Sequence, residues 1–240
     1  RRGDAARVIG RSPPFATDAQ RVVRDGQRSG GVLGGRLGAE DLTMAVPQYA
    51  GTKVTAAEYL DLERASAARH EFVGGEMFAM SGASLDHGLV VSNVVASLHR
   101  QLQGRDCFVV SSDLSVKVAA TSEYFYPDVI LACGSPVFAD DRRDVLLNPR
   151  VIVEVLSPST MSFDRGEKFA SYRLIPGFSE YVLLAQNRCH AEHFERQADG
   201  RWLLGETDSL EALLSLGSVG CSLQLGDVYE RLQWASQQPR

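Results

Sequence analysis

The stretch Val151-Ile-Val-Glu-Val-Leu156 is apolar at every position except one. An apolar run of this length, rich in β-branched side chains, is typical of a central strand covered on both faces. Glu154 interrupts the run, and burying an ionised carboxylate without a partner costs several kcal/mol. The stretch therefore predicts a layered sheet that contains a charged group in need of a cation, a hydrogen-bond network or a proton.

Outward from this strand, apolar periodicity and turn residues predict helices alternating with further strands. The expected helices are 55–68, one that begins at Ser84, 164–175 and a short one at 227–234; the expected strands are 70–73, 76–80, 107–118, 124–133, 181–185, 189–196 and 202–204. Since no repeat or linker divides residues 44–240, we expect a single domain of the α/β (α+β) class, with a mixed central sheet flanked by helices.

Charge is distributed unevenly along the 240 residues. Residues 1–43 hold eight arginines against five acids, whereas residues 44–240 carry a formal charge of −8. An acidic body argues against a nucleic-acid coat protein, whose affinity comes from clustered Lys and Arg. It leaves open an enzyme that reaches phosphates through a bound cation.

Residues 1–43 are rich in Arg and Gly, and Met44 is the first methionine. We expect this segment to be upstream sequence or a flexible extension, with a nucleic-acid-binding arm as the alternative. The four cysteines are dispersed, which favours reduced thiols in the cytosol. No apolar run suits a membrane span or a signal peptide, so a cytoplasmic protein is expected.

Two further charged residues stand in unexpected places. Asp128 follows Pro127 inside an apolar strand, and Lys168 lies on the helix after Glu154. If Asp128 and Glu154 approach to about 4 Å, they repel by about 4 kcal/mol at an effective dielectric constant of about 20. A divalent cation removes this penalty, and two carboxylates with the backbone carbonyl of Val155 suit Mg²⁺ or Mn²⁺.

Lys168 completes this candidate site. Asp164, Lys168, Tyr172 and Ile175 follow one another at spacings of four, four and three, so a helix that packs Ile175 on the sheet also turns Lys168 inward. A lysine beside a metal-bound water can orient that water or stabilise developing negative charge. A buried ion pair that only holds the helix to the sheet is an equally good interpretation of the spacing.

Other polar residues are weaker candidates. Glu76 in the hairpin and His87 near the start of the second helix are expected to face the cleft that would hold the metal or the scissile phosphate. Capping or core roles also explain both residues. Cys189, His190 and His193 suggest a metal tract, but residues 190 and 193 of a strand point to opposite faces.

Six motifs occur in an order and spacing that resemble the Uma-two family, which is described as restriction endonucleases of the PD-(D/E)XK superfamily. The motifs are Glu71-Phe-Val-Gly-Gly-Glu76, His87, Tyr126-Pro-Asp-Val129, Val153-Glu-Val-Leu-Ser-Pro-Ser-Thr160, Asp164-Arg-Gly-Glu-Lys168 and Glu180-Tyr181. The resemblance implies a restriction-endonuclease-like fold over the chain from about Thr55 to the last strands.

The same resemblance assigns the superfamily's first acid to Asp128 and its second to Glu154. The superfamily lysine normally stands two residues after the second acid, where this chain has Leu156. In the Uma-two pattern this lysine lies on the following helix, at Lys168. The sequence departs from the family at Ala185, where similar chains often carry Asp.

These observations predict a Mg²⁺-dependent (or Mn²⁺-dependent) endonuclease whose partner is nucleic acid, with DNA favoured over RNA. A homodimer is one expected assembly, and no membrane partner is expected. Two alternatives stay open: a catalytically silent binding or assembly module on the same fold, and a hydrolase of a small phosphoester.

Overall fold

The computed structural model describes residues 53–80 and 82–234, which all belong to the second of two units, Arg1–Glu40 and Asp41–Arg240. The expected boundary at residues 43 and 44 therefore lies outside the described residues. The elements are α1 (Ala56–Ala65), β1 (His70–Val73), β2 (Glu76–Ala79), α2 (Leu85–Leu102), β3 (Cys107–Ser111), β4 (Ser115–Val118), β5 (Glu123–Phe125), β6 (Val129–Cys133), β7 (Val145–Leu146), β8 (Val151–Leu156), α3 (Met161–Phe163), η1 (Asp164–Lys168), α4 (Phe169–Tyr172), β9 (Glu180–Ala185), β10 (Ala191–Arg196), β11 (Trp202–Thr207), β12 (Leu213–Leu216), β13 (Cys221–Gln224) and α5 (Leu225–Val228).

The central sheet has six strands in the order β11-β10-β9-β8-β6-β3. Strand β8 lies in its interior, parallel to β9 and antiparallel to β6, and all six of its residues are buried. The predicted fold class, a mixed sheet flanked by helices, is confirmed.

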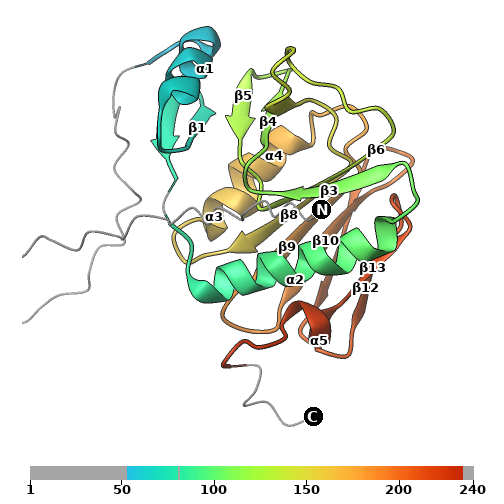
Figure 1. Ribbon diagram of the computed structural model, residues 1–240. Coiled ribbons are helices and arrows are strands. Elements are labelled where there is room, and N and C mark those ends of the chain that lie inside the picture. The colour runs from blue at the N-terminus through green and yellow to red at the C-terminus, as the bar shows by residue number, and fades with distance from the viewer. Residues whose placement is uncertain (1–52, 81, 235–240) are drawn as a thin grey trace, which may run out of the picture. The chain divides into compact units, whose positions relative to one another are not determined.

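Different elements cover the two faces of this sheet (Figure 1). On one face, Val94 and Leu98 of α2 pack in one core with Val153, together with β12, β13 and α5. On the other face, Phe169 and Tyr172 of α4 pack in a second core with Ile152. Alternate side chains of β8 therefore enter different cores, and Glu154 shares the face of Ile152.

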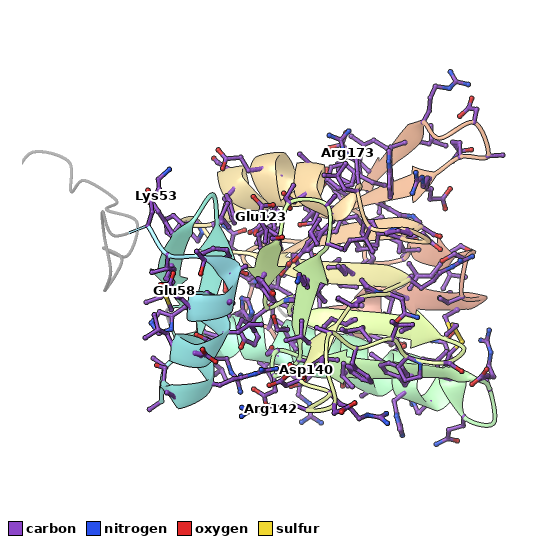
Figure 2. All side chains as sticks on the ribbon, turned by 90° about the horizontal axis from the view of Figure 1, so that it is seen from above. Lys53, Glu58, Glu123, Asp140, Arg142 and Arg173 are labelled. Carbon is purple, nitrogen blue, oxygen red and sulfur yellow. A yellow bond between two sulfur atoms is a disulfide. The ribbon has the colours of Figure 1, made fainter. Side chains whose placement is uncertain are left out.

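A smaller sheet of five strands, in the order β2-β1-β5-β4-β7, stands beside the central sheet. Helix α1 covers it through a third core, where Tyr59 stacks on Phe72 and contacts Tyr124. At the other side of α1, Arg64 forms ion pairs of 2.7 Å with Asp140 and Asp144, and Figure 2 shows Asp140 beside this helix.

Two of the expected long strands are each divided between the two sheets. The 107–118 segment breaks into β3 and β4 at Ser112, whose φ is +37°. The 124–133 segment breaks into β5 and β6 at Tyr126-Pro127-Asp128, because proline has no amide hydrogen to give to a ladder. The prediction of one strand in each segment is wrong, and the second break places Asp128 between the sheets.

The helical predictions also need correction at their ends. The expected 164–175 helix begins at Met161, continues as a π-helical turn over Asp164–Lys168 and ends at Tyr172. Helix α1 ends at Ala65, and the last helix is Leu225–Val228 instead of 227–234. The hairpin β12–β13 was not expected. None of the helices in the described part of the chain is long and apolar enough to cross a lipid bilayer.

The cysteines differ from the expectation of reduced thiols. Cys107 and Cys133 are direct partners on β3 and β6 and form a disulfide. The two cysteines are 26 residues apart in the sequence, and only the register of β3 and β6 brings them together. Cys189 and Cys221 are free and buried.

A capping box begins α1. The Thr55 hydroxyl accepts a hydrogen bond from the Glu58 amide, and the Glu58 carboxylate accepts one from the Thr55 amide. We expect Thr55→Ala to lower the free energy of unfolding by about 1 kcal/mol, because it leaves a helix-end amide without its partner. Urea unfolding measures this loss. Thr55→Ser keeps the oxygen and should stay close to wild type, so an equal loss in both variants would contradict the prediction.

Candidate functional site

Two acids meet where the chain steps from the small sheet to the central one. The Asp128 amide donates a hydrogen bond of 3.2 Å to Oε2 of Glu154, and the Val155 amide donates one of 2.8 Å to Oδ2 of Asp128. These reciprocal bonds extend the antiparallel pairing of β6 with β8, in which Val129 lies opposite Val153. The two carboxylates therefore converge beside Val155, where the pairing of β6 with β8 ends.

Lys168 joins this pair from the helical layer. Its Nζ lies 3.0 Å from Oε1 of Glu154, 2.9 Å from Oε1 of Glu71 and 3.6 Å from Oδ1 of Asp164. The Lys168 side chain is 6% exposed. Burial alone would lower the pKa of Lys168, but the three carboxylates outweigh burial and raise it well above its ordinary value. The amine therefore keeps its charge inside the protein.

The π-helical turn brings Asp164 and Lys168 into the same buried cluster. Both side chains are buried, whereas Arg165 and Glu167 of the same turn are not. A π turn inside an α-helix is rare and is frequent at functional sites. The amine points inward, the direction that the helical spacing predicts.

Burial dominates the electrostatics of the acids. It raises the pKa of Glu154 well above its ordinary value of 4.5; the charge of Lys168 opposes the rise, while the charges of Asp128, Asp164 and Glu71 add to it. Burial also raises the pKa of Asp164. The cluster thus holds more carboxylates than its lysine can neutralise, and it favours the uptake of a proton or a cation.

His87 reaches the cluster from the first turn of α2. The hydroxyl of Ser84, the N-cap residue, accepts a hydrogen bond from the His87 amide, which fixes this turn. Nε2 of His87 lies 2.9 Å from Oδ1 of Asp128. Burial alone would lower the pKa of His87, but its hydrogen bond to Asp128 and the nearby negative charges raise it above 6.5. The histidine therefore holds the Asp128 carboxylate in place.

The hairpin contributes Glu71 rather than Glu76. Glu71 lies opposite Phe78, and Glu76 lies opposite Val73. Both glutamates share one face, but Glu76 stands at the turn end, about 7 Å along the strand from the position opposite Glu71. Among the described residues, no side-chain hydrogen bond or ion pair joins Glu76 to the cluster. That Glu76 approaches the metal or the scissile phosphate stays a prediction.

Two further residues complete the cluster, and the sequence pattern could have indicated one of them. Glu71 also accepts a hydrogen bond of 3.2 Å from the Tyr126 amide. It alternates with the buried His70 and Phe72, so it must face away from their core, toward the other sheet. The Tyr172 hydroxyl donates a hydrogen bond of 3.1 Å to Oε1 of Glu154, and no sequence signal distinguishes this tyrosine from an ordinary core residue.

The sequence of this chain matches a known protein family. The family model Uma2, described as "Putative restriction endonuclease", matches residues 56–226. The chain belongs to the Uma2 family. The resemblance predicted from the six motifs is thereby confirmed, and the match includes every residue of the cluster.

Two curated relatives of this Uma2 chain come from Synechocystis sp. (strain ATCC 27184 / PCC 6803 / Kazusa). "Uncharacterized protein sll1609" is 38% identical over 158 residues, which cover 65% of this chain and 89% of the relative. "Uncharacterized protein slr1290" is 31% identical over 182 residues, which cover 75% of this chain and 93% of the relative. Their names state no activity.

A solved structure shares the fold of this Uma2 chain. It is described as a "putative nuclease belonging to DUF820" from Anabaena variabilis ATCC 29413, with a TM-score of 0.61 and 16% sequence identity. The similarity covers 73% of this chain and 97% of that one. At this identity the likeness shows the common architecture.

The donor set of the Uma2 cluster fits a hard divalent cation. Each oxygen of Asp128 and Glu154 accepts a hydrogen bond or faces a cation, yet a carboxylate has about four acceptor positions, so metal-binding capacity is left. In an extended strand the N–H and C=O of one residue point to the same side, so the Val155 carbonyl is directed to the side of Asp128. Oxygen-only ligands suit Mg²⁺ or Mn²⁺ better than Zn²⁺.

His190 and His193 of the Uma2 chain belong to two separate groups of acids on β9–β11. Nε2 of His193 lies 2.7 Å from Oε2 of Glu180, on the α2 side of the sheet. Nδ1 of His190 lies 2.6 Å from Oδ1 of Asp208. The register thus directs the two histidines to different partners, and neither contacts the cluster around Lys168.

Glu180 makes the stability of the Uma2 chain depend on pH. Burial alone would raise the pKa of Glu180, but hydrogen bonds from His193 and Ser218 outweigh burial and lower it below 4.5. A lowered pKa gives stability that is fully present above the unfolded value and is lost as the pH falls through the folded value.

We therefore expect Glu180→Gln to reduce the loss of unfolding free energy between neutral pH and pH about 3. Urea unfolding over this range measures the effect. Glu211→Gln, at an exposed position, is the control. Parallel pH curves for wild type and Glu180→Gln would contradict the prediction.

Proposed function

We propose that this protein is an endonuclease that hydrolyses phosphodiester bonds of nucleic acid, with DNA as its substrate, by using Mg²⁺ or Mn²⁺. The observation that carries the proposal is the buried cluster in which Glu71, Glu154 and Asp164 surround Lys168 and a fourth acid, Asp128, is bonded to Glu154. Membership of a family described as "Putative restriction endonuclease" supports this chemistry. Asp128, Glu154 and the Val155 carbonyl are the proposed metal ligands.

In the proposed reaction the metal and Lys168 have different roles. When bound, the metal supplies a polarised phosphoryl oxygen and a water of lowered pKa. Lys168 places a fixed positive charge beside this position, where it stabilises negative charge on the phosphoryl group. Because its charge is held by carboxylates in a buried site, little reorganisation is needed when the substrate arrives.

Three other residues position these groups. His87 fixes Oδ1 of Asp128, and Glu71 holds the Lys168 amine together with Glu154. Tyr172 fixes Oε1 of Glu154 from the helical layer. Each bond reduces the number of conformations in which the acids could face away from the metal, so these residues favour one geometry of the site.

A catalytically silent binding module is the second candidate. It is favoured by one observation, namely that Lys168, His87 and backbone amides already engage both Asp128 and Glu154 without a metal. A network satisfied in this way stabilises the fold by itself. The two candidates differ in whether a divalent cation changes the protein.

Metal dependence tests the proposal. Plasmid and single-stranded DNA are incubated at low salt with Mg²⁺, Mn²⁺ or a chelator, and the melting temperature is recorded against metal concentration. We expect cleavage only with metal, and a stabilisation of about 2.7 kcal/mol when the free metal is about 100 times its Kd. Cleavage in chelator would contradict metal dependence. An unchanged melting temperature together with intact DNA would favour the silent module.

A further inference from the structure

A cavity of about 280 Å³ opens at the ends of the parallel strands β8 and β9, outside the carboxylate cluster. Leu156, Met161 and Ala185 give it apolar walls, and Arg165, Asn187 and Arg188 give it polar ones. Apolar walls with a few polar groups are typical of small-molecule sites. The volume suits one sugar-phosphate unit better than a large ligand.

The cavity continues the face of the sheet that carries Glu154. Leu156 follows Glu154 by two residues, so both side chains point to the same side, about 7 Å apart along the strand. Ala185 lies opposite Leu156 in the register of β8 and β9. Arg165 is the residue after Asp164, within the same π-helical turn as Lys168. A ligand in the cavity would thus lie beside the proposed metal ligands.

One of the two arginines is fixed by a buried acid. Nε and Nη2 of Arg165 donate hydrogen bonds of 2.7 and 2.5 Å to Oε1 of Glu192, which is itself 5% exposed. These bonds use only part of the five N–H donors of a guanidinium. The Arg165 side chain is 34% exposed, so the rest of its donors can reach a ligand.

The other arginine stands on an anchored turn. Arg188 is exposed, and the ion pairs among residues 53–80 and 82–234 include no carboxylate partner for it. Gln186 of the same turn accepts hydrogen bonds from the Ser84 hydroxyl, at 2.7 Å, and from the Trp234 indole, at 2.9 Å. Ser84 begins the helix of His87, so this turn is held beside the cluster.

We propose that this cavity binds the phosphate of a nucleotide adjacent to the one that is cleaved, with Arg165 and Arg188 as the phosphate contacts and the apolar walls against its sugar. The inference rests on the proposed function for the identity of the polymer. Residues 44–240 carry a formal charge of −8, so a polyanion needs local cations to approach the acids. Guanidinium groups match phosphate geometry through paired N–H donors.

Arg188 gives the cleaner test, because its exposed side chain can be changed without disturbing the core. Binding of a fluorescently labelled DNA oligonucleotide is measured by anisotropy in chelator, where cleavage does not occur. We expect Arg188→Ala to weaken binding by about tenfold and Arg188→Glu to weaken it more, since a charged hydrogen bond is lost and then a repulsion is added. The slope of log affinity against log salt should fall by about one for Arg188→Ala.

Arg100→Ala is the matched control. Arg100 is also exposed, but it lies in the last turn of α2, about 20 Å along the helix from His87. We expect its affinity and salt slope to equal those of wild type. If Arg100→Ala weakens binding as much as Arg188→Ala, the effect is general charge and the cavity assignment is overturned.

The outcomes separate this inference from the proposed function. If Arg188→Glu binds the oligonucleotide as wild type does while wild type cleaves DNA, the cavity is overturned and the nuclease stands. If binding depends on Arg188 but no metal supports cleavage, the nuclease fails and the cavity stands. A parallel titration with inorganic phosphate, followed through the arginine side-chain NMR signals, gives the last outcome: phosphate binding as tight as that of the oligonucleotide overturns the polymer assignment.

Discussion

Lys168→Ala is expected to slow cleavage of DNA by about a hundredfold or more, the usual scale for removing one preorganised charge. The amine lies within 3.0 Å of both Glu71 and Glu154, so its removal leaves these carboxylates without their cation. In chelator the variant should therefore melt at a lower temperature than wild type. Added Mg²⁺ should stabilise the variant at least as much as wild type, because the metal no longer competes with the lysine for Glu154.

The measurements are single-turnover cleavage rates at saturating metal and melting curves with and without metal. Lys117→Ala is a matched control, because Lys117 lies over the ring of Tyr124 in the small sheet, away from the cluster. If Lys168→Ala cleaves DNA as fast as wild type, the assignment of the catalytic lysine to the helix is wrong. If the cleavage rate of wild type is itself weak, the silent module would then be the better interpretation.

Glu154→Gln should abolish both cleavage and stabilisation by metal, since it removes one of the two proposed carboxylate ligands. Its stability in chelator should depend on pH differently from that of wild type. The raised pKa of Glu154 means that its contribution to stability is complete below the unfolded value of 4.5 and is lost as the pH rises through the folded value. Glutamine stays neutral, so the variant should gain stability relative to wild type as the pH rises.

Isothermal titration with Mn²⁺, melting curves from pH about 4 to 8 and cleavage assays check these three expectations. Glu123→Gln provides the control, because Glu123 is bonded to Ser171 and Thr121 at the outer end of β5. Metal-dependent stabilisation that survives in Glu154→Gln would show that the cation binds elsewhere. A loss of stability at every pH would show that Glu154 serves mainly as an ionised partner of Lys168.

The central residues of the cluster could be predicted because a charged residue at a position that is expected to be buried needs a partner. Glu154 in an apolar strand and Lys168 on the inner side of a helix each require a partner, and the structure places them 3.0 Å apart. Glu71 was missed because a charged residue in a four-residue hairpin strand looks like an ordinary solvated one. Alternation with His70 and Phe72 directs Glu71 away from their core, but only the packing of the small sheet beside the central sheet gives that face its partners.

The fold shows the same division between local and long-range information. The capping box, the Gly74-Gly75 turn and the central strand are set by neighbouring residues, and the structure has the central strand where it was expected. The breaks at Ser112 and Pro127 were missed because apolar residues lie on both sides of each break. The Cys107–Cys133 disulfide and the β12–β13 hairpin depend on strand pairing, which periodicity does not specify.

The Tyr126-Pro127-Asp128 step has a consequence for the dynamics of the protein. Asp128 is held on one side by a strand of the central sheet and is joined on the other to β5 of the small sheet, so its position requires both sheets to be formed. The amides of Asp128 and Val155, which bond the two carboxylates, should then exchange with deuterium only when the whole domain opens. The cluster would form in the same cooperative event as the fold, and a partly folded chain would be inert.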